Sequence, residues 1–519
     1  MIAIARRFAR LLSTSLSRNF VYRLLARRSI AGLLRRCAPP LLGAAVAASG
    51  PATAWAQNAG TVDSPWVRNI NAEATKALGD AGALGLAAIP LDGPGQAQYL
   101  NADTLMSPGS IVKVITTYAA LEILGPNYRW DTTLLTDGRI EGEVLKGNLY
   151  LRFGGDPKLT IERLWTTLGE LPGMGIRRID GNLVLDGSHY RLAAGQPAFE
   201  DNGDNPNAPF LVAPSPYLSN LNLQQFHLLA DERGVRAWAT PALPQVAIDN
   251  QVKAAPAGTC PGRDDFTWQP VASGDGRITL TVSGTLPRNC RSSTYLSLLP
   301  QATYSAALIR KLLTDYGVAI TGQDALARAP DTARELASTT SPDLVTMVRD
   351  VNKWSSNVMA RSLLLTIGAH TRGEQEQDDV AAGLRALRSW LESKGVDTAG
   401  LVIDNGAGLS RASRLTPRQV LQLLQQAWRS PFAVDLLSSM PIIATDGTMT
   451  RRLRNTALAG EGRIKTGSLD HVRSIAGFVR DRNQTTWAVA AMVNHNPAWN
   501  GQAVLDKVLY NLHYKPPAS

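Results

Sequence analysis

The sequence has few of the side chains that bind metals or carry out redox chemistry. Its 519 residues include three cysteines and six histidines, and the histidines are scattered along the chain. Cys37 lies in the leader segment described below, so one pair of cysteines remains. That pair alone cannot supply the ligand spacing of a zinc site. We therefore expect neither a metal ion nor an organic cofactor.

The chain also lacks the Gly-x-Ser-x-Gly sequence that forms the nucleophile elbow of α/β-hydrolases. This absence argues against a Ser-His-Asp hydrolase of that type. No repeat of 20–50 residues is apparent, so a solenoid or propeller is not expected either. Any catalytic serine would need a base other than the histidine of such a triad.

Residues 1–56 contain no acidic side chain but hold nine arginines. Removing nine positive charges from the formal net charge of +10 leaves +1, so the remaining chain gives no reason to expect nucleic-acid binding. An apolar stretch at 38–50 and the sequence Ala-Trp-Ala at 54–56 follow the arginines, as in a cleaved export signal. The stretch is too short and too interrupted by Gly and Pro for a transmembrane anchor. An organelle transit peptide is the alternative.

Export would place Cys260 and Cys290 in an oxidising compartment. We expect these two cysteines to form one disulfide. The alternative is a pair of unpaired, buried thiols.

The hydrophobic content of 44% and the length of the chain predict more than one domain. Helical and strand-like patterns alternate up to about residue 130. Short alternating runs with frequent Gly, Pro and Asn then predict a β-rich region. Helical patterns follow, and the chain ends with a predicted hairpin and a final helix.

The segment SPGSIVKVITTYAALEILG, residues 107–125, places a lysine inside an apolar helical run. Ser107 is expected to cap this helix, which puts Ser110 in the first turn and Lys113 on the same face. A serine hydroxyl needs a base, and burial or a nearby cation can lower the pKa of a lysine until the amine is neutral. Lys113 is the only one of eleven lysines with a serine three places before it. The alternative is a lysine that extends to solvent.

Two further short motifs occur later in the chain. Ser355-Ser356-Asn357, at a predicted helix start, offers a hydroxyl for proton relay and an amide for a substrate carbonyl. Lys465-Thr466-Gly467, on a predicted strand, offers a cation and a hydroxyl to an anion, with a glycine that permits close backbone approach. Taken alone, the first motif is usually a helix cap and the second a turn.

In this order, the three motifs resemble the signature of the penicillin-recognising serine enzymes. The chain is similar to the D-alanyl-D-alanine carboxypeptidase/endopeptidase family of low-molecular-mass penicillin-binding proteins of class C. The 245-residue separation of Ser110 and Ser355 adds to the resemblance, because this family carries an inserted pair of small domains there. Further matching segments are GNLYLRFGGDPKL, GIRRIDGNLVLD, LSNLN, NGAGLSR and MPIIATDGTMTRR.

The resemblance implies an α/β fold, with a β-lactamase/DD-peptidase-like domain that has an antiparallel sheet and helices on both faces. A large β-rich insert interrupts this domain. The implied organisation is a signal peptide at 1–56, a peptidase domain in two parts at 57–130 and 325–519, and an insert of two small subdomains at 131–324.

The resemblance also implies a role for each motif. Ser110 would be acylated, Lys113 would be its general base, and Ser355 would pass protons toward the leaving amine. The substrate-binding residues would be Asn357 for the substrate amide, Lys465 and Thr466 for the terminal carboxylate, and Gly467 and Ser468 on the adjoining strand. The backbone N–H groups of Ser110 and Ser468 would form the oxyanion hole. The departures from the family pattern, none of which removes a catalytic group, are Ser356, Asn405, Ala407 and Ser468.

These features predict an exported, periplasmic enzyme, peripherally associated with membrane or wall, that acts on peptidoglycan stem peptides and cross-links. β-Lactam antibiotics would inhibit it covalently. One alternative is a β-lactamase or related serine esterase of the same superfamily, for which the large insert would serve little purpose. A non-catalytic wall-binding scaffold is the other alternative, and the intact motifs argue against it.

Overall fold

The computed structural model describes residues 64–193, 206–496 and 498–517. The expected signal peptide, residues 1–56, lies outside the described residues. Within these ranges, no helix is long and apolar enough to cross a bilayer.

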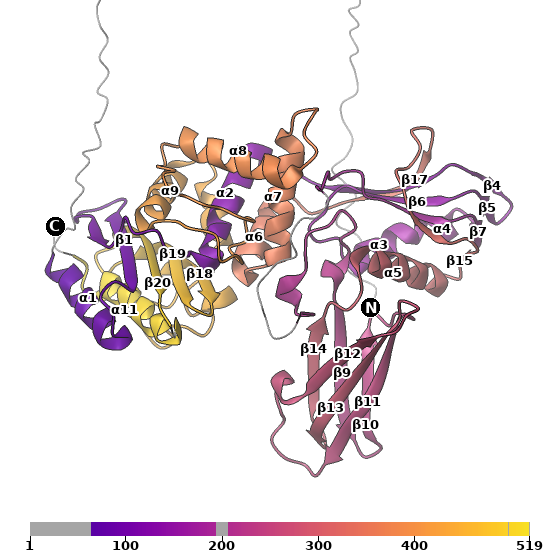
Figure 1. Ribbon diagram of the computed structural model, residues 1–519, viewed down its shortest axis with the longest axis horizontal. Coiled ribbons are helices and arrows are strands. Elements are labelled where there is room, and N and C mark those ends of the chain that lie inside the picture. Colours follow the sequence, from indigo (N-terminus) through magenta and orange to yellow (C-terminus); the bar gives the residue numbers. More distant parts are fainter. Residues whose placement is uncertain (1–63, 194–205, 497, 518–519) are drawn as a thin grey trace, which may run out of the picture. The chain divides into compact units, whose positions relative to one another are not determined.

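The peptidase domain is built on an antiparallel sheet of five strands in the order β18-β19-β20-β1-β2 (Figure 1). The strands are β1 (Leu84–Pro90), β2 (Gln98–Leu100), β18 (Gly462–Leu469), β19 (Val472–Arg480) and β20 (Thr486–Asn494). The two early strands thus join the three C-terminal strands in one sheet. This confirms the predicted antiparallel sheet.

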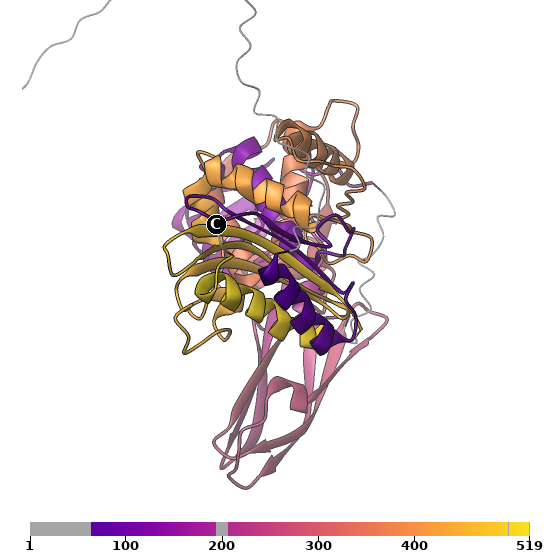
Figure 2. The same ribbon diagram turned by 90° about the vertical axis from the view of Figure 1, so that its left-hand side faces the viewer.

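Helices cover both faces of this sheet (Figures 1 and 2). On one face lie α1 (Pro65–Leu78) and α11 (Gly501–Tyr514). The core on the other face is formed with α2 (Val112–Leu124), α6 (Leu344–Trp354), α7 (Asn357–Thr371), α8 (Asp379–Ser393), α9 (Pro417–Arg429) and α10 (Ala433–Ser439). Strand β1 shows how the sequence divides the two cores. Leu84 and Leu86 belong to the first core and Ala87 to the second, because successive strand residues point to opposite faces.

The first part of the insert contains two sheets, ordered β16-β8-β6-β3-β17 and β15-β7-β5-β4. Their strands are β3 (Asp131–Thr136), β4 (Arg139–Glu141), β5 (Val144–Lys146), β6 (Leu149–Phe153), β7 (Arg178–Asp180), β8 (Leu183–Asp186), β15 (Ala319–Ile320), β16 (Asp324–Leu326) and β17 (Arg334–Thr340). The helices of this part are α3 (Ile161–Leu168), α4 (Glu170–Gly173) and α5 (Gln301–Asp315). They share one hydrophobic core with the strands.

The second part of the insert is a sandwich of two three-stranded sheets, β10-β9-β14 and β11-β13-β12 (Figure 1). Its strands are β9 (Gln224–Asp231), β10 (Gly234–Thr240), β11 (Val246–Ala255), β12 (Thr267–Ala272), β13 (Ile278–Pro287) and β14 (Arg291–Leu296). Phe226 and Leu228 of β9 are buried against residues of the facing sheet.

The strand pairing differs from the sequence-based organisation at the end of the insert. Strand β17 pairs with β3, and β16 pairs with β8, so the paired segment runs from Asp131 to Thr340 rather than to residue 324. The pattern of these short strands could not reveal this, because their partners lie more than 130 residues earlier in the chain. Three helices also contribute to the first part of this β-rich insert within the described residues.

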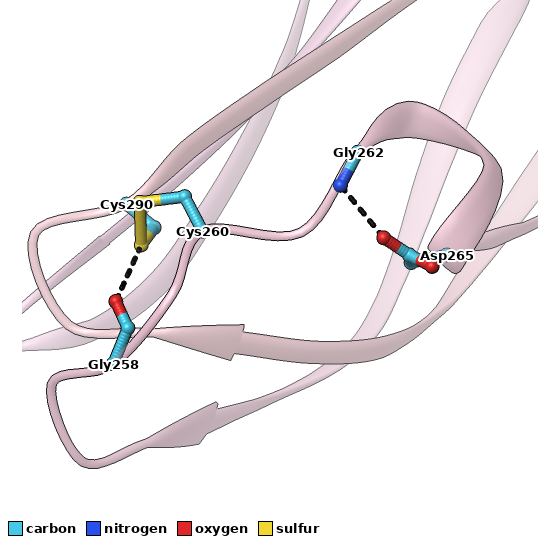
Figure 3. Close-up of a disulfide and its surroundings, with 5 residues drawn as sticks. All are labelled: Gly258, Cys260, Gly262, Asp265 and Cys290. Carbon is cyan, nitrogen blue, oxygen red and sulfur yellow. Dashed lines mark hydrogen bonds between the residues drawn. A yellow bond between two sulfur atoms is a disulfide. The ribbon is translucent and has the colours of Figure 1, made fainter.

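Cys260 and Cys290 are joined by a disulfide that closes a loop of 30 residues within the sandwich (Figure 3). The Sγ atom of Cys290 also lies 3.8 Å from the carbonyl oxygen of Gly258. Cys290 belongs to the small core that Leu228 and Val282 form between the two sheets. The bond therefore ties the loop before β12 to the start of β14.

We predict that this bond forms in the exported protein and stabilises the sandwich by roughly 3 kcal/mol, because it restricts the unfolded chain. Thiol labelling of the denatured, unreduced protein without residues 1–56 should find almost no free thiol. The variant Cys290→Ser should expose one thiol and unfold at lower denaturant concentration. Quantitative labelling of both cysteines in the unaltered protein would contradict the prediction.

Candidate active site

Ser110 lies in a short 3-10 turn, η1 (Gly109–Ile111), that leads directly into α2. The expected cap by Ser107 is wrong: no side chain caps this turn, and Ser107 Oγ is buried without a hydrogen-bond partner among the described residues. Instead, the side chain of Asn494 at the end of β20 holds the backbone of Ser107. The Ser107 N–H donates to Asn494 Oδ1 over 2.7 Å, and Asn494 Nδ2 donates to the Ser107 carbonyl over 3.0 Å. The sheet, not a local cap, therefore positions the serine turn.

Lys113 is completely buried in α2, and its Nζ atom lies close to three oxygen atoms. These are Ser110 Oγ at 2.9 Å, Asn357 Oδ1 at 2.7 Å and the Ala407 carbonyl oxygen at 2.5 Å. Burial, and secondarily the charge of Lys465, hold the pKa of Lys113 well below its usual range. A neutral amine has two N–H donors and one lone pair. If the amide and carbonyl oxygens accept the two N–H bonds, the lone pair is left for the proton of the Ser110 hydroxyl.

Ser355 lies between α6 and α7 and has a left-handed backbone, with φ at 57°. This conformation is uncommon for a residue other than glycine. The next residue, Ser356, caps α7 by accepting a hydrogen bond from the backbone N–H of Met359. Ser356 therefore caps the helix, and the hydroxyl of Ser355 is not needed for capping and can contact the other residues of the site.

Lys465 is completely buried on β18, and its Nζ atom donates to Ser355 Oγ and to the Thr466 carbonyl, each over 2.8 Å. Burial lowers the pKa of Lys465 to about 7. The sequence analysis assigned a cation to this position, and at neutral pH the amine of the free site is only partly protonated. A bound carboxylate would raise this pKa, because an adjacent negative charge favours the protonated form.

The side chain of Asn357, at the first position of α7, joins the base to the insert. Its Oδ1 atom accepts from Lys113, and its Nδ2 atom donates to the carbonyl of Phe210 over 3.0 Å. Phe210 belongs to the short helix η2 (Pro209–Leu211) of the insert. The amide is thereby fixed in one orientation, and its second N–H remains available to another acceptor.

The backbone of β18 runs against the serine turn. A Cβ atom added to Gly467 would lie 2.8 Å from the Ser110 nitrogen and 2.2 Å from Ser474 Oγ. A Cβ atom added to Gly109 would lie 3.4 Å from the Ser468 nitrogen. The backbone segments that carry the N–H groups of Ser110 and Ser468 therefore pack against each other. An oxyanion hole requires two such donors beside the nucleophile.

Sequence reasoning assigned no role to the segment behind the serine turn, which supplies the Ala407 carbonyl. Gly408 has φ at 74°, and a Cβ atom there would lie 1.9 Å from the Gly109 carbonyl oxygen. Gly406 also has positive φ, at 67°. The two glycines in NGAGLSR were the sequence feature that could have indicated a close backbone contact of this segment, because closely packed backbone and positive φ both favour glycine.

A second residue that sequence reasoning missed is Thr448 in η5 (Gly447–Met449). Its Oγ1 atom lies 2.8 Å from Thr466 Oγ1. An ion pair of 2.6 Å between the buried amine of Lys353 and Asp446 anchors this segment beside the motif strand. Thr448 is therefore in place to orient the Thr466 hydroxyl. In the sequence, the segment TDGTMT was the one feature that could have indicated this position of Thr448.

Within the described ranges, no group of three His, Cys, Asp or Glu side chains is arranged to hold a metal ion. The chemistry that the geometry supports needs no such group. It consists of a serine hydroxyl beside a buried amine, a second hydroxyl beside a second amine, and two backbone donors at the serine.

This fold and this constellation of side chains define a serine enzyme of the penicillin-recognising class. The profile of the D-Ala-D-Ala carboxypeptidase 3 (S13) family matches residues 76–512, and the chain belongs to this family. The predicted resemblance, the fold class and the serine-type carboxypeptidase activity are thereby confirmed.

Two curated relatives are similar over most of their length. The D-alanyl-D-alanine carboxypeptidase DacB of Haemophilus influenzae is 27% identical over 442 residues, which cover 83% of this chain and 89% of the relative. A D-alanyl-D-alanine carboxypeptidase from an Actinomadura species is 29% identical over 401 residues, which cover 72% and 70% of the two chains.

Solved structures show the same fold. The crystal structure of penicillin binding protein 4 (dacB) from Haemophilus influenzae matches with a TM-score of 0.69 at 24% identity, covering 86% of this chain and 99% of that chain. A structure of the same Haemophilus influenzae protein complexed with a novel β-lactam matches with a TM-score of 0.67 at 25% identity and the same coverage.

We predict that Gly467→Ala slows acylation of the enzyme by a β-lactam at least about 10²-fold, because the new methyl group would push β18 away from the serine turn. Gly173→Ala is the matched control, since a Cβ atom at Gly173 meets no atom within 4 Å. The acylation rate with a fluorescent penicillin and the circular dichroism spectrum of both variants are the measurements. A Gly467→Ala protein that reacts at the normal rate would show that this contact is not needed.

Proposed function

We propose that the protein is a periplasmic serine peptidase that cleaves the D-Ala-D-Ala bond of peptidoglycan stem peptides through an acyl-enzyme on Ser110. Membership of the S13 family supports the carboxypeptidase reaction. The observation that carries the mechanism is the buried amine of Lys113, 2.9 Å from Ser110 Oγ and in contact with two acceptors that occupy its N–H groups.

In the acylation step, Ser110 Oγ attacks the carbonyl carbon of the penultimate D-alanine while its proton moves to Lys113 Nζ. The N–H groups of Ser110 and Ser468 stabilise the negative charge on the carbonyl oxygen. A proton then reaches the amine of the last D-alanine through Ser355, and the C–N bond breaks. This leaves an ester on Ser110 and a free D-alanine.

Substrate binding supplies the negative charge that Lys465 lacks as a partner in the free site. The terminal carboxylate binds Lys465 and Thr466, and this contact keeps Lys465 protonated. Deacylation reverses the first step with water as the nucleophile: water gives its proton to Lys113, attacks the ester carbonyl, and Ser110 recovers its proton as it leaves.

The same chemistry extends to cross-links, because a cross-link is also an amide formed by the carbonyl of a D-alanine. We therefore include endopeptidase activity in the proposal. A β-lactamase would need rapid hydrolysis of the penicilloyl ester, and the family assignment favours the peptidase. Turnover of a D-Ala-D-Ala peptide together with slow release of bound penicillin is the combination that identifies a peptidase.

Penicillin should acylate Ser110 and no other residue. Intact-mass spectrometry should show one adduct per chain, and digestion should locate it on the peptide that contains Ser110. Ser110→Ala removes the nucleophile and should give no adduct. An adduct that persists in this variant would place the nucleophile elsewhere and overturn the mechanism.

Replacing each of the two lysines of the site by arginine should impair different properties of the enzyme. Lys113→Arg keeps a cation that cannot act as a base, so acylation by penicillin and peptide turnover should both fall by about 10² or more. Lys465→Arg keeps the positive charge and should retain measurable acylation with weaker substrate affinity. Normal acylation by Lys113→Arg would show that another group deprotonates Ser110.

The pH profile of kcat/KM separates the two roles further. Because Lys113 must be neutral, the rate should rise with pH as that amine loses its proton, well below the usual lysine range. Because Lys465 must be protonated, the rate should fall above its pKa of about 7. Lys465→Arg should abolish the fall on the alkaline side, since arginine stays charged. If kcat/KM of this variant still falls at alkaline pH, that fall reports the titration of a different group.

A further inference from the structure

The sandwich of the insert carries an exposed surface that the peptidase mechanism does not use. It is the outer face of the β10-β9-β14 sheet, and we call it the aromatic face. Its residues are Gln225, His227, Leu229, Arg236, Trp238, Thr240, Arg291, Ser293 and Tyr295. Residues directly opposite one another on paired strands point to the same side of a sheet, which places these nine side chains together.

The alternation along β9 separates this face from the core. Phe226 and Leu228 are buried between the sheets, whereas His227 lies between them in sequence and is only partly buried. Trp238 and Tyr295 remain 42% and 48% exposed. The face therefore keeps large aromatic rings in water although the opposite side of the same strands is an ordinary apolar core.

The rings are ordered rather than scattered. The Trp238 indole stacks on the His227 imidazole, with ring centroids 4.9 Å apart and planes 13° from parallel. Ser293 lies opposite His227 on the other neighbouring strand, and Gln225 Nε2 donates to Ser293 Oγ over 3.4 Å. Flat rings thus alternate with donors and acceptors on a rigid sheet.

This combination matches the surface of a sugar chain. The faces of pyranose rings carry C–H groups, which are attracted to the electron-rich faces of aromatic rings. Their edges carry hydroxyl groups, which bond to amide and hydroxyl side chains such as those of Gln225 and Ser293.

Size favours the same ligand over a protein. Three strands about 4.8 Å apart and three rows of side chains cover roughly 200–300 Å², well below the approximately 800 Å² per partner of a specific protein interface. Arg236 and Arg291 flank Leu229, and only Arg236 is paired with an acid on this sheet, Asp231 at 2.9 Å. Both guanidinium groups also offer N–H donors to the hydroxyl groups of a sugar.

We propose that the aromatic face binds the glycan strand of peptidoglycan and holds the enzyme on its polymeric substrate. This inference rests on the proposed function, because it assumes that peptidoglycan is the substrate. The face lies on a different part of the chain from the catalytic residues, so binding and catalysis should be separable by mutation.

The test compares the double variant Trp238→Ala/Tyr295→Ala with the unaltered enzyme. Glycan strands freed of their stem peptides are the probe, and affinity is measured by sedimentation or microscale thermophoresis. We expect at least tenfold weaker glycan binding, with unchanged hydrolysis of a soluble D-Ala-D-Ala peptide and slower hydrolysis of intact sacculi. Trp165→Ala is the matched control, because Trp165 is an exposed tryptophan, stacked on Tyr316, on the other part of the insert.

Each other outcome overturns the inference. Equal glycan binding by the double variant would show that the face is not the site. Binding only to fragments that retain stem peptides would assign recognition to the peptide, and binding only to another protein would make the face a protein interface. If the double variant loses its fold, the single variants Trp238→Ala and Tyr295→Ala replace it, and unchanged glycan affinity in both would overturn the inference. Failure of the unaltered enzyme to hydrolyse the soluble peptide would instead refute the proposed function.

Discussion

The burial of the Lys113 amine is the constraint on which the site depends. An amine removed from water must be neutral or must be paired with other groups, and here its partners are a hydroxyl, an amide oxygen and a backbone carbonyl rather than a carboxylate. Ser110, Asn357 and Ala407 lie far apart in sequence, so the amine meets all three only when the fold is complete. The base is therefore produced by tertiary packing, and no local segment of the chain could generate it.

The two buried lysines have different neighbours. The Lys113 amine contacts two fixed acceptors and the Ser110 hydroxyl, so a neutral amine there would have its lone pair toward the serine. Lys465 contacts one hydroxyl and one carbonyl, so it has a donor left for an incoming anion when it is protonated. Neither lysine has an acidic partner in these contacts. A carboxylate near either amine would raise its pKa, and at Lys113 that change would remove the base.

The sequence revealed the chemistry more fully than the architecture. The antiparallel sheet was implied by the family resemblance, and the motif side chains were recognisable because each carries a distinctive functional group. The Ala407 carbonyl was not, since a backbone acceptor leaves no mark on residue identity. The capping role given to Ser107 failed because Asn494, nearly four hundred residues away, holds that backbone instead. The pairing of β16 with β8 and of β17 with β3 could not be derived from local alternation, because the paired strands lie more than 130 residues apart.

The insert is bonded to helices α6 and α8 of the domain that contains the candidate site residues. Lys158 forms an ion pair of 2.7 Å with Asp350 of α6, and the Arg191 N–H donates to Asp379 of α8 over 2.8 Å. The most direct connection is the Asn357 amide, which bonds to the insert through Phe210 and to the base through its other end. Moving η2 would turn this amide and remove an acceptor from Lys113. The insert is therefore linked to the Lys113 amine through one side chain, that of Asn357.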